Sequence, residues 1–180
     1  MRILAISGSL RAASSNNMVL QAIRNLAPEN IDVKIYDALD KLPHFNPDLD
    51  GDTPPDAVHD LRALIGNSDG VIISCPEYAH GVPGSLKNAL DWLVGSLEFS
   101  GKPVALINTS PRATHAQESL QEILITMSAR LIPEAFATVS LLGRAVDAQA
   151  ITSDPELSGI LSRSISAFAL AINSVLAETD

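Results

Sequence analysis

The chain opens with a short apolar segment that runs directly into a loop of small polar residues and then into a helical pattern. Residues 2–7 are almost entirely apolar, as in a strand that is buried on both faces of a parallel sheet. Residues 7–17 combine one glycine and one arginine with several serines and asparagines, and helical spacing covers 15–27. Such a loop is typical of an anion site, because it offers hydroxyls and N–H groups beside the positive end of a helix dipole.

Strands and helices alternate along the rest of the chain. Apolar segments predict four further strands, at 31–35, 70–75, 103–108 and 135–142. Helices are predicted from residue 54, over 83–95, over 114–129 and over 155–177. Five β-α repeats predict a parallel sheet that is covered by helices on both faces. We therefore expect one α/β domain over residues 1–180, with strand order 2-1-3-4-5 and its ligand beside strands 1 and 3.

One connecting segment is predicted to have less regular structure. Residues 37–54 contain three turn signals and no periodicity, so we expect a long surface loop there. The last helix is expected to begin near Pro155, with Ser153 or Asp154 as its N-cap.

Composition narrows the classes of function. The 180 residues are 46% hydrophobic, which is enough for a sizeable core, and they carry a net charge of −9. That charge argues against sequence-independent binding to nucleic acid. We see no signal peptide and no apolar run of the roughly 18 residues that span a bilayer. We therefore expect a soluble, cytoplasmic protein with no membrane partner.

The titratable side chains do not predict a metal site. The single cysteine, Cys75, excludes an intramolecular disulfide and a Cys-based metal cluster, and we expect its thiol to be buried and inert. His44, His59 and His115 have no second ligand at a spacing that a metal requires. We therefore expect no metal.

The first loop matches neither of the two common nucleotide-binding loops. It lacks the glycine pattern of the dinucleotide fingerprint and the Gly-Lys-Ser/Thr of the phosphate loop. Instead, the Arg11 guanidinium can grip a phosphate, and the Ser9, Ser14 and Asn16 side chains can donate hydrogen bonds. The alternative is structural: serine and asparagine only cap the helix, and Arg11 is solvated.

A second polar loop follows the predicted strand 70–75, on the other wall of the same crevice. Residues 76–92 read Pro-Glu-Tyr-Ala-His-Gly-Val-Pro-Gly-Ser-Leu-Lys-Asn-Ala-Leu-Asp-Trp. Exposed backbone groups and the flat ring of Tyr78 suit a planar heterocycle. The alternative is that Pro83-Gly84 only starts a helix. We expect Trp92 to be buried, either in the core or at a subunit interface.

Together the two motifs resemble the NADPH-dependent FMN reductase family, which has a flavodoxin-like fold and includes quinone, azo-dye and chromate reductases. The motifs are Gly-Ser-Leu-Arg-x-x-Ser-x-Asn at residues 8–16 and Pro-Glu-Tyr-x-x-x-x-Pro-Gly-x-Leu-Lys-Asn-x-x-Asp-Trp at 76–92. The resemblance is weakest after about residue 140. It implies an FMN-dependent NAD(P)H oxidoreductase that passes hydride from NADPH or NADH to bound FMN. A quinone, an azo compound, a metal oxyanion or free flavin would then accept the electrons.

The same resemblance implies roles for individual residues and an assembly. The first loop and helix start would hold the FMN phosphate through Ser9, Arg11, Ser14, Asn16, Asn17 and Met18. The flavin ring would lie against Pro76, Glu77, Tyr78 and Ser110. Lys87, Asn88 and Asp91 would be scaffold or interface residues. The family implies a homodimer or homotetramer, with the Trp92 helix and the 37–54 loop as interface elements. No catalytic side chain is implied, because the flavin carries the chemistry.

Three features depart from the family pattern. Ala79 stands where the family usually has asparagine, which removes one side-chain donor. His80 and Gly81 follow where an aromatic residue and serine are common. The loop at 108–115 is shorter than the glycine-rich loop of many relatives. His80 is a candidate substrate contact, although a solvated surface histidine is the alternative. Arg112 is a candidate contact for a phosphate of the nicotinamide cofactor.

Two other functions stay open from the residues alone. One is a flavodoxin-like electron carrier with no nicotinamide step, which the acidic charge fits. The other is a flavin-free protein that binds a phosphate ligand. Arg11 and the Pro-Glu-Tyr loop favour the reductase, because small electron carriers typically hold phosphate with a loop rich in Ser/Thr and Gly.

Overall fold

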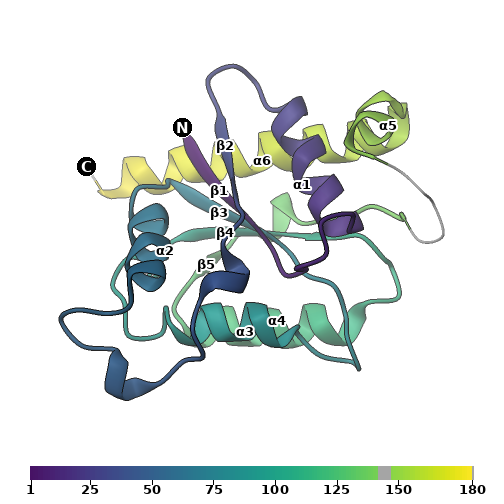
Figure 1. The fold of residues 1–180 in the computed structure, drawn as a ribbon. Helices are drawn as coiled ribbons and strands as arrows, with labels where there is room; N and C mark the ends of the chain where they lie inside the picture. The colour runs from purple at the N-terminus through teal and green to yellow at the C-terminus, as the bar shows by residue number, and fades with distance from the viewer. Residues whose placement is uncertain (142–146, 180) are drawn as a thin grey trace.

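A parallel sheet lies between two layers of helices in the computed structural model, which describes residues 1–141 and 147–179 (Figure 1). The strand order is β2-β1-β3-β4-β5, with β6 also paired to β4. This order confirms the predicted 2-1-3-4-5 topology. The strands are β1 (Arg2–Ser7), β2 (Asp32–Tyr36), β3 (Gly70–Ser74), β4 (Pro103–Asn108), β5 (Arg130–Leu131) and β6 (Ala137–Thr138).

Alternate residues of each strand face opposite helical layers, because successive side chains of a strand point to opposite sides of the sheet. In β1, Ile3 and Ala5 belong to one buried cluster, whereas Leu4 and Ile6 belong to the other. The first cluster is covered by α1 (Ser15–Leu26), α5 (Ala148–Ser153) and α6 (Pro155–Thr179). The second is covered by α2 (Asp56–Gly66), α3 (Gly84–Asp91) and α4 (Thr114–Thr126).

The fifth position of the sheet differs from the prediction. A single strand over 135–142 was expected, but two short strands, β5 and β6, share the edge of β4. A short 3-10 helix, η3 (Pro133–Ala135), separates them. Pro133 has no N–H to give to a ladder, so the strand is interrupted there. Val139 and Leu141 still donate backbone hydrogen bonds to Asn108 and Thr109, and residue 142 lies outside the described residues.

Several helix ends also differ from the prediction. Both α3 and α4 end earlier than expected, and α5 was not predicted. The cap of α6 is Asp154 rather than Ser153, because its Oδ1 accepts hydrogen bonds from the N–H groups of Glu156 and Leu157.

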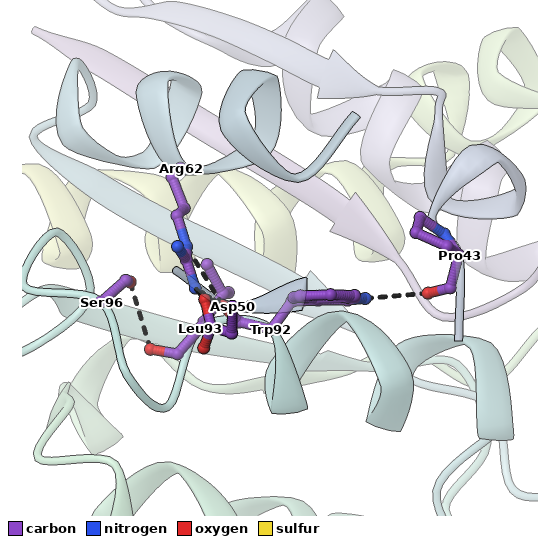
Figure 2. A network of polar contacts seen from close by, with 6 residues as sticks. All are labelled: Pro43, Asp50, Arg62, Trp92, Leu93 and Ser96. Carbon is purple, nitrogen blue, oxygen red and sulfur yellow. Dashed lines mark hydrogen bonds and ion pairs between the residues drawn. The ribbon is translucent and has the colours of Figure 1, made fainter. Parts of the chain in front are cut away.

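The 37–54 segment is not a free surface loop. It contains two 3-10 helices, η1 (Leu39–Lys41) and η2 (Pro47–Leu49), and it packs on α2 and α3. The indole Nε1 of Trp92 donates to the carbonyl of Pro43 over 2.8 Å, and Arg62 Nη2 lies 2.6 Å from Asp50 Oδ1 (Figure 2). Arg62 also donates to the carbonyl of Trp92. These long-range contacts have no periodic signature, so only the tertiary structure reveals them.

Trp92 is fully buried within this chain, which decides between the two predicted locations, the core and a subunit interface. Its ring lies in the core cluster of α2, α3 and α4, and Phe45 packs edge-on against it at 5.0 Å between ring centroids. Trp92 is therefore a core residue of this chain. The Asn88 side chain donates to Pro43 and accepts from Phe45, which is the scaffold role expected for it.

The last helix is long and apolar. By length and composition alone, residues 155–178 pass the test for a membrane span, contrary to the expectation that no segment would. One face of this helix, however, packs on the sheet through Leu161, Ile165, Phe168 and Ile172. A single helix of this length and composition is weak evidence for a membrane span, because core helices of soluble proteins meet the same criteria.

Candidate functional site

Three loops meet at the carboxyl edge of the sheet, where β1, β3 and β4 end. In such sheets this edge is where ligands bind, next to the point where the strand order reverses. The first and second loops approach closely at Gly8. A Cβ there would lie 3.0 Å from Leu86 Cδ2 and 3.1 Å from Pro76 Cδ. Glycine therefore lets the first loop pack against the loop that follows β3.

The first loop is organised by its own hydroxyl groups. Ser9 Oγ accepts the N–H of Arg11 at 3.3 Å, and Ser14 Oγ accepts the N–H of Asn17 at 3.1 Å as the N-cap of α1. The Asn17 side chain in turn donates to the carbonyl of Arg11 at 2.9 Å. Both serines are buried. Hydrogen bonds within the loop itself therefore support its shape.

This organisation leaves hydrogen-bond donors free at the start of α1. The N–H groups of Asn17 and Met18 are bonded to Ser14, so they are already satisfied. Those of Ser15 and Asn16 have no acceptor within residues 1–141 and 147–179. The exposed Arg11 guanidinium likewise has no acidic partner among these residues. A positive helix end with free donors and an unpaired guanidinium fits an anion such as a phosphate group.

Asn16 connects this loop to the sheet. Its Oδ1 accepts a hydrogen bond of 2.8 Å from the hydroxyl of Ser74, at the end of β3, and both residues are buried. Because the oxygen is held, the orientation of the Asn16 amide is fixed and its NH2 group keeps a defined direction. Sequence analysis did not single out Ser74. The available signal was a hydroxyl at the end of an otherwise apolar central strand.

The second loop contains a tight turn at Tyr78–Gly81. The two end residues exchange backbone hydrogen bonds of 3.2 and 3.0 Å. Ala79 and His80, between them, have φ values of 49° and 59°. Positive φ at both central positions is typical of a type I′ turn, which favours asparagine and glycine. The Tyr78 side chain is largely exposed beside this turn.

Glu77 ties this turn to α4. Its Oε2 accepts the N–H of Ala116 at 2.9 Å, and its Oε1 lies 3.4 Å from Nδ1 of His80. Residue Ala113, at the N-cap of α4, has no side chain that could make this bond. The His80 ring also packs edge-on against His115, with centroids 4.4 Å apart. The sequence placed Glu77 only against the flavin ring, so the capping role of its side chain is a finding of the structure.

The third loop closes a cleft between the ends of β3 and β4. Asn108 Oδ1 accepts the N–H of Ser110 at 3.0 Å, and Ser110 Oγ accepts the N–H of Arg112 at 3.3 Å. The Arg112 side chain is exposed and has no ion pair among the described residues. The cleft has a volume of about 320 Å³ and is lined by Cys75, Pro76, Glu77, Asn108, Thr109, Ser110, Arg112 and Ala113.

Cys75 belongs to the wall of this cleft but is not poised to react. Cys75 is buried. This burial, together with the nearby Glu77 carboxylate, raises the pKa of the thiol to about 12. This agrees with the expected inert thiol. Among residues 1–141 and 147–179, no group of three His, Cys, Asp or Glu side chains is arranged to hold a metal ion.

Comparisons with known proteins identify the class to which this fold and site belong. The family model described as NADPH-dependent FMN reductase matches residues 1–141, most of the chain. The chain therefore belongs to the NADPH-dependent FMN reductase family. This confirms the expected class, an FMN-dependent NAD(P)H oxidoreductase, and argues against the flavin-free alternative.

Individual relatives agree with this assignment. A quinone reductase of Pseudomonas putida is 38% identical over 146 residues, which cover 74% of this chain and 76% of the relative. An NAD(P)H-dependent FMN reductase of Pseudomonas aeruginosa is 30% identical over 94% of each chain. Among solved structures, the flavoenzyme NAD(P)H:(acceptor) oxidoreductase FerB from Paracoccus denitrificans has a TM-score of 0.76 and 29% identity, covering 96% of this chain and 97% of its own.

Proposed function

We propose that this protein uses NADPH or NADH to reduce bound FMN and then passes the electrons to a small-molecule acceptor, with quinones as the leading class. This proposal rests on two features of the site that lie on either side of Gly8. One is a set of free cationic and N–H donors at the start of α1. The other is the cleft between β3 and β4. The names of the quinone reductase relatives support the choice of acceptor.

The first loop would hold the FMN phosphate. Arg11 would supply the charge, the Ser9 and Ser14 hydroxyls and the Asn16 amide would supply hydrogen bonds, and the free N–H groups of Ser15 and Asn16 would complete the cradle. The contribution of Asn17 and Met18 would be indirect. Their N–H groups bond Ser14 and so fix the start of α1.

The cleft would receive the flavin ring. Pro76 and Glu77 would line one side, largely through the main chain, and Ser110 would line the other. Tyr78, the next residue along the chain, would contact the ring at the edge of the cleft. When bound there, FMN supplies the hydride chemistry of the reaction. The protein orients the ring and limits its contact with water. His80 and Arg112, at the edge of this region, would contact the acceptor or the nicotinamide cofactor.

The assembly and location are further parts of the proposal. Residues 1–180 would form one FMN-binding domain, and two or four copies would associate in the cytoplasm. Val94 and Leu97, just beyond α3, are strongly exposed and would suit a contact between copies better than the buried Trp92. The net charge of −9 supports the absence of nucleic-acid partners.

Stopped-flow mixing tests the reductase proposal. The protein, purified and loaded with FMN, is mixed anaerobically with NADPH or NADH, and the flavin absorbance is followed. Bleaching on a catalytic timescale is expected. If neither nicotinamide bleaches the flavin, but the reduced protein still passes electrons to a partner, the protein is an electron carrier instead.

A further inference from the structure

The two oxygens of the Glu77 carboxylate are assigned to different partners. Oε2 accepts the N–H of Ala116 in the first turn of α4, and Oε1 faces Nδ1 of His80. The Glu77 side chain is only 14% exposed, so solvent competes weakly for its oxygens. The carboxylate therefore accepts a helix N–H on one side and lies 3.4 Å from an imidazole nitrogen on the other.

His115 fixes the same imidazole from a second direction. It lies in the first turn of α4, and the planes of the two rings meet at 82°. The titratable groups in contact with His80 are thus Glu77 on its own loop and His115 on α4. The His80 side chain is otherwise 76% exposed. Since Nδ1 is directed at Glu77, Nε2 is the ring atom left to meet a ligand or water.

From this arrangement we propose that His80 donates a proton to the electron acceptor, and that Glu77 and His115 position its ring. The inference rests on the proposed reductase function and deepens it. Reduction of a quinone to a hydroquinone consumes two electrons and two protons. A hydride brings both electrons and one proton, so a second proton must reach the other oxygen of the quinone.

His80 can supply that proton without net change to the protein. In its imidazolium form, Nε2–H breaks and the proton forms an O–H bond on the acceptor, while Nδ1–H stays directed at Glu77. The ring is then neutral, and it recovers a proton at Nε2 from solvent, to which it is open. Histidine suits this role because its charge changes near neutral pH, whereas the guanidinium of Arg112 does not give up a proton.

Separate half-reactions test this role. The FMN-loaded protein is reduced with dithionite and mixed with either 1,4-benzoquinone or ferricyanide, which takes one electron and no proton. His80→Gln is expected to slow oxidation by the quinone by about 100-fold, the scale of a positioned proton donor. Oxidation by ferricyanide is expected to stay unchanged. His59→Gln is the matched control, because His59 lies 3.8 Å from Asp60 in a similar but distant pair.

Dithionite reduces the flavin without NADPH or NADH. The experiment therefore tests the role of His80 even if neither nicotinamide bleaches the flavin. The two proposals therefore fail separately. Equal slowing of the quinone and ferricyanide reactions would overturn the proton-donor role, since it would show a general loss of flavin access. An unchanged quinone reaction would overturn it as well.

Glu77→Gln tests the positioning role. Glutamine has one acceptor oxygen, which the N–H of Ala116 requires, so its NH2 group would face His80. The cap of α4 would survive, while the acceptor that faces Nδ1 is replaced by a donor. Nitrogen NMR of the FMN-free protein is expected to show neutral His80 protonated at Nδ1 in the wild type and at Nε2 in Glu77→Gln. The quinone rate should fall with this change. An identical tautomer in both proteins would overturn the positioning role of Glu77.

Discussion

The hydroxyl of Ser74, at the end of β3, donates a 2.8 Å hydrogen bond to the side-chain oxygen of Asn16, in the first turn of α1. The same hydroxyl lies 3.0 Å from the carbonyl of Ile107 in β4. One buried serine therefore joins the first loop of the candidate site to the two strands that flank the cleft. The relative position of the proposed phosphate and ring subsites depends on this contact.

Ser74→Ala is expected to lower both stability and FMN affinity. Removing the hydroxyl leaves the oxygen of Asn16 buried without its donor, which costs about 1–3 kcal/mol. Urea unfolding and fluorescence titration with FMN measure the two effects. Ser119→Ala, on the exposed face of α4, is the control and should change neither. Full FMN affinity in Ser74→Ala would show that Asn16 needs no support to hold its place.

Arg11→Ala is expected to weaken FMN binding by about 1.5–3 kcal/mol, the usual contribution of a hydrogen bond to a charged group. This corresponds to roughly a 10- to 150-fold rise in Kd. Stability should be unaffected, because the side chain of Arg11 is exposed and unpaired among the described residues. Arg24→Ala, in the last turn of α1, serves as a control of equal charge. An unchanged Kd in Arg11→Ala would remove Arg11 from the phosphate site.

Ala79→Gly is expected to stabilise the protein by about 1 kcal/mol. Ala79 has a positive φ of 49°, where a Cβ is unfavourable and glycine is not. Ala27→Gly makes the same chemical change at a φ of −62°, where only the entropic cost of glycine remains. The two variants should therefore shift the urea midpoint in opposite directions. A loss of stability in Ala79→Gly would contradict the turn geometry.

Trp92→Ala is expected to destabilise the fold by about 3–5 kcal/mol, the cost of deleting a fully buried aromatic side chain. It also leaves the carbonyl of Pro43 without its indole donor. Unfolding at several protein concentrations separates this role from an interface role. The loss of stability should not depend on concentration if Trp92 is a core residue. A concentration-dependent loss would place the ring at a subunit interface.

Cys75 is expected to resist thiol reagents at pH 8 in the folded protein and to react with them when urea has unfolded the chain. Its pKa is raised to about 12 by burial and by Glu77, whereas an exposed thiol ionises near 9. The stability that this shift contributes is complete below pH 9 and is lost progressively as the pH rises toward 12. Cys75→Ala should flatten that part of the stability–pH curve. Rapid labelling of the native thiol at pH 8 would contradict the buried position.

Much of the architecture was predictable because it rests on local patterns. Apolar strands and amphipathic helices alternate in the chain, and right-handed crossovers then restrict the strand order. The same holds for the three loops of the candidate site, since each follows a predicted strand. The split of the edge strand was missed. The alternating pattern of residues 137–141 predicted one strand over 135–142, whereas β6 covers only Ala137–Thr138 and β5 lies before Pro133.

The residues that shape the site were harder to predict than the residues that line it. Ser9, Arg11 and Ser14 were singled out as candidates because capping and anion binding use recognisable residue types near a helix start. The bond from Ser74 to Asn16 joins residues 58 positions apart, and the contact of Glu77 with Ala116 spans 39. Nothing in the local sequence around either residue encodes such a partner.

The sequence by itself determined the class of fold, the position of the candidate site loops and the family, because periodicity and loop chemistry are local properties of the chain. Only the tertiary structure decided that Trp92 belongs to the core, that residues 37–54 are fastened to α2 and α3, and that Glu77 holds both α4 and His80. Those outcomes depend on which distant groups meet once the sheet has formed. Hydrogen bonds and close packing act at contact distance, so their partners are set by the folded arrangement rather than by sequence spacing.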